Sequence, residues 1–81
     1  MKNIAFYGGG NISQAVIQGL IYSGFNKDNI FYIERNAVNQ KKLKKLKIKK
    51  INNKTKIDLF ILAVKPKDAI HAYKDILNKY S

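Results

Sequence analysis

Residues 4–13 have the sequence IAFYGGGNIS, in which an apolar run leads through three consecutive glycines into a helical pattern. The chain has five glycines among its 81 residues, and three of the five lie in this stretch. Glycine loses more backbone entropy on ordering than any other residue, and it is favoured where a turn needs unusual dihedral angles or where another group approaches the backbone closely. The stretch therefore predicts a strand, a tight turn and a helix, in that order.

Two further apolar runs predict buried strands, at residues 30–33 and at residues 59–64, the latter entered from Ile57. Continuous runs, rather than alternating ones, are expected where helices cover both faces of a parallel sheet. A weaker candidate lies at residues 48–51, where lysines interrupt the apolar pattern. Such a segment suits the edge of a sheet.

Helical patterns separate these strands. A first helix should follow the glycines and end at Gly24. Its expected apolar face holds Ile12, Val16, Leu20 and Ile21. A second, Lys-rich helix should begin after Asn36, a favourable cap, with a thinner apolar stripe at Val38, Leu43 and Leu46. A last helix should begin near Pro66. Its apolar positions are Ala69, Ile70, Tyr73, Ile76, Leu77 and Tyr80.

The order of these elements predicts an α/β fold, a partial Rossmann-type doubly wound parallel sheet with about four strands and three helices. Residues 1–81 are expected to form one dinucleotide-binding domain. A full doubly wound domain continues with further strands, so the chain is expected to be a fragment or a reduced domain.

The glycine turn is placed where a dinucleotide pyrophosphate binds, between the first strand and the first helix. Gly8 would allow the tight turn, and Gly10 would remove a side chain so that the backbone can approach the pyrophosphate. The helix that follows directs its free N–H groups and the positive end of its dipole toward this anion. Ser13 occupies the position of a third small residue. A turn with only a structural role is the alternative.

The end of the second strand, at Glu34 and Arg35, bears on the choice of cofactor. Glu34 lies 24 residues after Gly10, which suits a carboxylate that accepts hydrogen bonds from the adenosine ribose of NAD. The neighbouring Arg35 favours the 2′-phosphate of NADP instead. The two residues therefore point to different cofactors, and exposed loop charges without a role are the alternative for each.

The last strand ends in the sequence AVKP, residues 63–66. Ligands of open parallel sheets lie beyond the carboxyl ends of the strands, so this segment should lie beside the glycine turn, near the nicotinamide half of a cofactor. Alternatively, Pro66 only starts a helix and Lys65 is only an exposed charge. No catalytic residue is assigned, and the single histidine, His71, is expected at the surface. With one His, no Cys and five carboxylates, no metal site is expected.

The chain is strongly basic, with 16 Lys and Arg against 5 Asp and Glu and a net charge of +11. Its lysines cluster around the second helix, at Lys41, Lys42, Lys44, Lys45, Lys47, Lys49 and Lys50. A basic module that binds nucleic acid nonspecifically is therefore one possible function. We favour a compositional bias that raises Lys, Ile and Asn together, and do not expect nucleic acid as a partner. Without cysteine, a signal peptide or a membrane-spanning run, we expect a soluble, cytoplasmic protein.

Three segments together resemble the N-terminal NAD(P)-binding domain of pyrroline-5-carboxylate reductase: IAFYGGGNISQAVIQGLIYSGF, IERN and LFILAVKPKD. The resemblance implies an oxidoreductase that reduces 1-pyrroline-5-carboxylate to L-proline, the last step of proline biosynthesis, with NADP as the expected cofactor and NAD as the alternative. The cofactor-binding residues that it implies are Tyr7, Gly8, Gly9, Gly10, Asn11, Ile12, Glu34, Arg35, Asn36, Asn53, Ala63, Val64, Lys65 and Pro66.

The sequence departs from this family at three points. Ser13 replaces the usual Ala or Gly, and Ile12 the usual Met or Leu. The helix between the third and fourth strands is missing, close to the position of Asn53. The family's second, all-helical domain, which holds the imino-acid substrate and forms the dimer, has no counterpart here. We therefore expect cofactor binding with little or no turnover by this chain alone. A deazaflavin-dependent NADP reductase-like domain and a decayed, inactive remnant are the alternatives.

Overall fold

The computed structural model describes residues 2–52 and 54–80. Its elements are β1 (Ile4–Tyr7), α1 (Asn11–Tyr22), the short 3-10 helix η1 (Lys27–Asn29), β2 (Ile30–Ile33), α2 (Ala37–Lys45), β3 (Lys49–Lys50), β4 (Leu59–Leu62) and α3 (Pro66–Tyr80). None of the helices in these two ranges combines the length and the apolar character that crossing a membrane requires.

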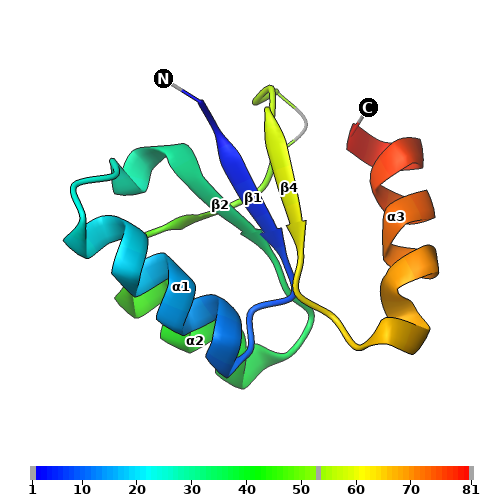
Figure 1. Ribbon diagram of the computed structural model, residues 1–81, viewed down its shortest axis with the longest axis horizontal. Coiled ribbons are helices and arrows are strands. Elements are labelled where there is room, and N and C mark those ends of the chain that lie inside the picture. Colours follow the sequence, from blue (N-terminus) through cyan, green and yellow to red (C-terminus); the bar gives the residue numbers. More distant parts are fainter. Residues whose placement is uncertain (1, 53, 81) are drawn as a thin grey trace.

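The four strands form one parallel sheet in the order β3-β2-β1-β4. β1 lies in the centre, where Ile4 is aligned with Ile30 of β2 and with Leu59 of β4. Because the register has no stagger across these three strands, their carboxyl ends meet at one edge, next to the glycine turn (Figure 1). The predicted α/β fold with a partial Rossmann-type sheet is confirmed, and β3 lies at an edge as expected.

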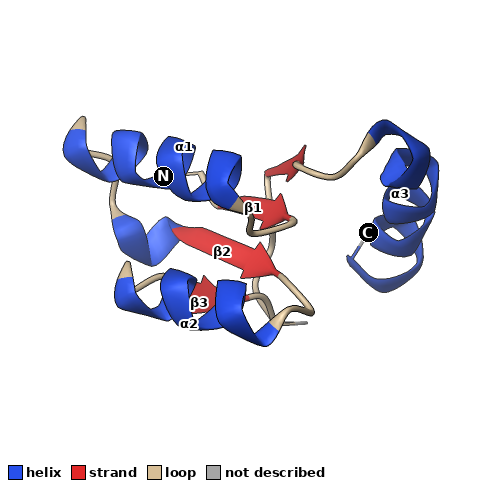
Figure 2. Ribbon diagram, turned by 90° about the horizontal axis from the view of Figure 1, so that it is seen from below, coloured by secondary structure: helices blue, strands red, loops and turns tan. Residues whose placement is uncertain are grey.

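Helices lie on both sides of the sheet. α1 and α2 lie next to each other on one face, and α3 stands apart beyond the other side (Figures 1 and 2). The larger core cluster fills the space under α1 and α2; its buried side chains are Ile4, Phe6, Ile17, Ile30, Tyr32, Leu43 and Ile48. A smaller cluster on the opposite face contains Ala5, Phe31 and Ile51. This arrangement explains why β1 and β2 are continuously apolar rather than alternating. β4 was also expected to be buried, but none of its residues is, and Leu59 and Leu62 at its two ends are exposed.

Of the predicted apolar face of α1, Leu20 and Ile21 pack against the core as expected, whereas its first two residues do not. Ser13 and Ile17 are the buried residues of the helix, whereas Ile12 is 79% exposed and Val16 is 44% exposed. The Ser13 hydroxyl donates a hydrogen bond to the Gly8 carbonyl oxygen at 2.6 Å. This bond ties the first turn of α1 to the end of β1, so that the inner stripe begins at position 13 rather than at position 12.

α3 also differs from the prediction. It buries Ala72 and Ile76, whereas three large side chains of the predicted apolar face, Ile70, Tyr73 and Leu77, are exposed. The helix therefore packs on the sheet with small and few side chains. Its contact with the sheet includes a hydrogen bond between Tyr7 and Asp75.

The connection between β3 and β4 contains no helix within the described residues, in agreement with the sequence. Asn52 stabilises its turn by accepting hydrogen bonds from the backbone N–H groups of Lys54 and Thr55. The connection returns to the amino end of the sheet, where the backbone N–H of Asn3 donates to the Asp58 carboxylate at 2.8 Å. The predicted strand at 59–64 is shorter than expected and ends at Leu62.

Candidate cofactor-binding site

The three consecutive glycines have three different surroundings. Gly8 has a φ of +102°, and a Cβ atom there would collide with the carbonyl group of Ala63. A Cβ at Gly9 would overlap the Leu43 side chain, so this glycine is needed for the packing of α2. A Cβ at Gly10 would meet no protein atom within 4 Å. The fold therefore requires Gly8 and Gly9, while Gly10 keeps open a space that the protein itself does not fill.

Gly10 is also the N-cap of α1, and no side chain there forms a capping hydrogen bond. The first turn of the helix contains no acidic residue. The free N–H groups and the positive end of the helix dipole therefore face the open space without a negative charge from the helix's own first turn. A pyrophosphate is the type of group that this arrangement favours.

Side chains at the start of α1 hold the glycine turn in shape. The Gln14 amide donates to the Gly9 carbonyl oxygen at 2.8 Å, beside the bond from Ser13 to Gly8. The Gly8 backbone N–H donates to the carbonyl oxygen of Ile33 at 2.9 Å. The bond to Ile33 connects the turn to the end of β2. Serine at position 13 contributes a hydrogen bond to the turn, whereas an alanine there would contribute only a van der Waals contact.

Glu34 turns its carboxylate back toward the glycine turn. One oxygen accepts a hydrogen bond from the Gly9 backbone N–H at 2.6 Å, and the other accepts from the backbone N–H groups of Arg35 and Asn36 at 2.9 and 3.0 Å. Both carboxylate oxygens are therefore already bonded to the backbone. The Asn36 side chain accepts from the Asn39 backbone N–H at 3.0 Å, which makes it the N-cap of α2, as predicted.

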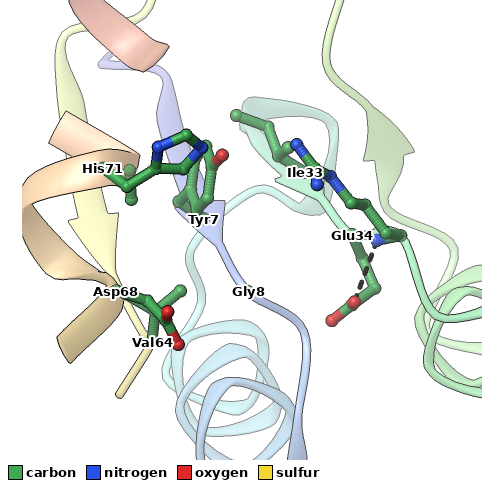
Figure 3. Close-up of a pocket in the computed structure, with 9 residues that line it drawn as sticks. Tyr7, Gly8, Ile33, Glu34, Val64, Asp68 and His71 are labelled. Atoms are coloured by element: carbon green, nitrogen blue, oxygen red, sulfur yellow. Dashed lines mark hydrogen bonds between the residues drawn. The ribbon is translucent and has the colours of Figure 1, made fainter. Parts of the chain in front are cut away.

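A cavity of about 270 Å³ opens at the carboxyl ends of β1 and β2. It is lined by Tyr7, Gly8, Ile33, Glu34, Arg35, Val64, Asp68, His71 and Ala72. Figure 3 shows that Tyr7 and His71 lie on one side of this cavity and Glu34 on the other. The structure thus brings predicted residues from three separate segments of the sequence to one place.

Three lining residues, Asp68, His71 and Ala72, come from α3 and were not predicted as site residues. His71 is exposed, as expected, but it borders the cavity. A signal for these residues was present in the sequence. Positions 68, 71 and 72 lie on one face of a helix that begins at Pro66, directly after the last strand.

The Tyr7 hydroxyl donates a hydrogen bond to the Asp75 carboxylate at 2.7 Å, across the gap between β1 and α3. Lys79 forms an ion pair with the same carboxylate at 3.2 Å. The bond from Tyr7, followed by the contact with Lys79, holds the pKa of Asp75 below its ordinary value of 3.8. Tyr7 therefore has a structural contact in addition to its place at the cavity.

The remaining predicted residues lie around the turn. A second hollow is lined by Ile12, Leu62, Ala63, Val64 and Lys65. Asn11 and Pro66 are the first residues of α1 and α3. Asn53 lies outside the described residues. Across residues 2–52 and 54–80, no cluster of three His, Cys, Asp or Glu side chains is placed to hold a metal ion.

Comparison with known proteins agrees with this geometry. Residues 3–81 match the family described as "NADP oxidoreductase coenzyme F420-dependent". The chain is 37% identical to pyrroline-5-carboxylate reductase 2 of Bacillus subtilis (strain 168), over 94% of this chain and 30% of that protein. The solved structure of a pyrroline-5-carboxylate reductase from Coxiella burnetii superposes with a TM-score of 0.81 at 26% identity, covering 95% of this chain and 30% of that one. The chain thus spans less than a third of the length of either relative. Since the family match covers all but the first two residues, the chain belongs to this family of NAD(P)-dependent oxidoreductases.

Proposed function

We propose that the chain binds NADP(H), with the pyrophosphate in the open space over Gly10 and the uncapped start of α1. The observation that carries the proposal is that Gly10 alone of the three glycines has no neighbour for a Cβ, although it lies beside two glycines that the fold requires. A structural turn has no need of a glycine at such a position. A ligand phosphate that approaches the backbone does need one.

The two hollows suit the two halves of a dinucleotide. The adenosine half would lie in the cavity beside Glu34, Arg35 and Val64, and the nicotinamide half in the hollow beside Ile12 and Ala63. The other expected contacts remain part of the proposal: Tyr7, Gly8, Gly9, Asn11, Asn36, Asn53, Lys65 and Pro66. A bound nicotinamide would supply the hydride, and the residues of this chain would bind and orient the cofactor.

Arg35 supports NADP over NAD. Glu34 has both carboxylate oxygens bonded to backbone N–H groups, so it is less available to a ribose hydroxyl, whereas Arg35 is exposed at the cavity. We expect Arg35→Ala to weaken NADPH binding at least tenfold and NADH binding less than threefold, because one charge-assisted pair with the 2′-phosphate is worth roughly 1.5–3 kcal/mol. Calorimetric titration with each cofactor measures both effects, and equal losses would mean that Arg35 does not contact the phosphate.

Calorimetric titration of the 81-residue chain with NADPH, at low and at moderate salt, tests the proposal itself. Saturable binding that persists at moderate salt is expected. Gly10→Val should abolish it, because the branched side chain would occupy the pyrophosphate space, while the circular dichroism spectrum stays unchanged. Gly19→Ala is the matched control, since its Cβ also meets open space but lies at the far end of α1. Affinity retained in Gly10→Val would overturn the proposal.

We further propose that the bound cofactor serves the reduction of 1-pyrroline-5-carboxylate to L-proline in the cytoplasm. Both relatives are named as pyrroline-5-carboxylate reductases, which supports this proposal. Because the chain spans about a third of their length, we expect little turnover by the chain alone. An all-helical substrate domain, made separately, should restore NADPH oxidation when mixed with the chain. No gain over either part would exclude a split enzyme of this kind.

The family description also names coenzyme F420, which makes a deazaflavin-dependent NADP reductase the second candidate. Both candidates require the same NADP site, so cofactor binding does not distinguish them. Titration with coenzyme F420 in the presence of NADP does. We expect no binding of the deazaflavin, and saturable binding would favour the second candidate.

A further inference from the structure

Nearly all of the net positive charge of the chain lies in one segment. Residues 35–57 contain ten of the sixteen basic residues and no acidic residue. The rest of the chain contains six basic and five acidic residues, so it is nearly neutral. A compositional bias toward Lys acts on the whole chain, and it does not account for the lack of every carboxylate from one segment.

The structure gathers most of these charges on α2 and β3. We call them the lysine surface, which consists of Lys41, Lys42, Lys44, Lys45, Lys47, Lys49 and Lys50. All seven are exposed. The side of α2 that faces the core is formed by Leu43, so the four lysines of the helix occupy its outer side. β3 lies beside α2 at the edge of the sheet, away from α3 (Figure 2).

These lysines have no compensating charge in the chain. Within residues 2–52 and 54–80, no carboxylate lies within ion-pair distance of any of them. Lys41 and Lys45 are four residues apart on one helix, a spacing at which like charges repel and destabilise the helix. Lysines at an exposed strand edge prevent edge-to-edge aggregation, which explains Lys49 and Lys50 but not the lysines of α2. An anionic partner would relieve the repulsion.

From this lysine surface we infer a second binding site, for the phosphate backbone of nucleic acid. Duplex DNA carries one charge per roughly 1.7 Å of its axis, so the roughly 14 Å of α2 faces several phosphates. Residues 35–57 contain no aromatic side chain on which a base could stack. Binding is therefore electrostatic, independent of base sequence and strongly dependent on salt.

A lipid surface is a poorer partner for the same charges. A helix that lies on a membrane inserts apolar side chains next to its basic ones. The inner apolar residue of α2, Leu43, is fully buried in the protein core, which leaves Val38 as its exposed large apolar side chain. The lysine surface thus offers charge with little apolar area to insert.

Fluorescence anisotropy with a labelled duplex of about 20 base pairs tests the inference at roughly 50–200 mM salt. One variant carries K41Q, K45Q, K49Q and K50Q. Its matched control carries K2Q, K27Q, K67Q and K74Q, which removes the same charge outside the segment. We expect the first variant to lose at least tenfold in affinity and its salt slope to fall by about 3, while the control loses less than threefold. A smaller variant, K42Q and K44Q, should lower the slope by about 2.

Equal losses in the two fourfold variants would overturn the inference, since net charge alone would then explain binding. So would an unchanged affinity of the smaller variant, or tighter binding to vesicles of anionic phospholipid than to the duplex at equal salt. Saturating NADPH separates this site from the cofactor site. Displacement of the duplex by NADPH would assign the binding to the glycine turn instead, whereas binding that persists in Gly10→Val supports a separate surface.

Discussion

Gly8, Gly9 and Gly10 are adjacent in the sequence, yet the structure gives each a separate task. Sequence motifs treat them as one glycine-rich turn, because the motif records residue types and not neighbours. The position of the turn was predictable from the strand and the helix on either side. The contact of Gly9 with Leu43 was not, because it depends on where α2 packs.

At Gly8 the fold, rather than the ligand, excludes a side chain. We expect Gly8→Ala to lower the free energy of unfolding by about 1–3 kcal/mol, because it combines a strained positive φ with a collision against Ala63. Gly10→Ala should change it by less than about 0.5 kcal/mol, a typical effect away from packed groups. Urea titration of the two variants measures both values, and equal destabilisation would contradict the separate tasks.

Glu34 illustrates how far the candidate site could be predicted. Its position at the end of β2, near the glycines, followed from its spacing of 24 residues from Gly10. The direction of its carboxylate did not, since it is set by three backbone N–H groups, and one of them, that of Gly9, comes from a distant segment of the sequence. The position of Glu34 in the sequence therefore does not by itself indicate NAD or NADP.

Among the elements, the strands were predicted well and the helix faces poorly. Continuous apolar runs have one interpretation in a covered parallel sheet. The helical periodicity of α1 allows two interpretations, a buried stripe that starts at Ile12 or one that starts at Ser13. The two stripes share Leu20, and one is turned relative to the other by one residue around the helix. The polar Ser13 favoured the wrong stripe, and the hydrogen bond to Gly8 that selects the right one is a tertiary contact.

The assignment of the buried face of α1 is directly testable. Ile17 is fully buried, so Ile17→Ala should reduce the free energy of unfolding by about 2–4 kcal/mol. Ile12→Ala removes the same atoms from a side chain that is 79% exposed, and it should cost less than about 0.5 kcal/mol. If urea titrations show comparable losses in the free energy of unfolding for the two variants, the buried face of α1 is the one predicted from periodicity.

At the scale of the whole molecule, α3 leaves much of its apolar stripe uncovered. Periodicity predicted the helix and its apolar stripe, but it does not say what covers the stripe. Within the described residues, Ile70, Tyr73 and Leu77 remain exposed, and so do Leu59 and Leu62 of the neighbouring edge strand β4. The attachment of α3 depends to a larger extent on Ala72, Ile76 and the polar contact between Tyr7 and Asp75.

This polar contact makes the attachment of α3 sensitive to acid. Folding lowers the pKa of the Asp75 carboxyl below 3.8. The ionised carboxylate therefore stabilises the folded chain at any pH above the pKa that Asp75 has in the unfolded chain. This stabilisation is lost as the pH falls through the pKa that Asp75 has in the folded chain. We expect a nearly constant contribution from about pH 7 to pH 5 and a decline below about pH 4. Asp75→Asn should make thermal unfolding less dependent on acid, and Tyr7→Phe should act in the same direction.

Thermal melts at each pH, with Asp28→Asn as the control, measure this contribution. Asp28 is an exposed carboxylate in η1, away from α3. An acid-induced decline that is the same in Asp75→Asn as in the unmodified chain would mean that the contact with Tyr7 does not hold the helix.

The uncapped start of α1 links the stability of the chain to the supply of its ligand. A helix whose first turn has neither a capping side chain nor an acidic residue is stabilised when an anion arrives at its start. A ligand that binds only the folded chain raises the free energy of unfolding by RT ln(1 + [L]/Kd). At one hundred times Kd the gain is about 2.7 kcal/mol, a large part of the stability of so small a domain. The fraction of chains that survive proteolysis in the cell would then rise and fall with the concentration of free cofactor. The amount of this chain in the cell would thus follow the amount of cofactor that is available.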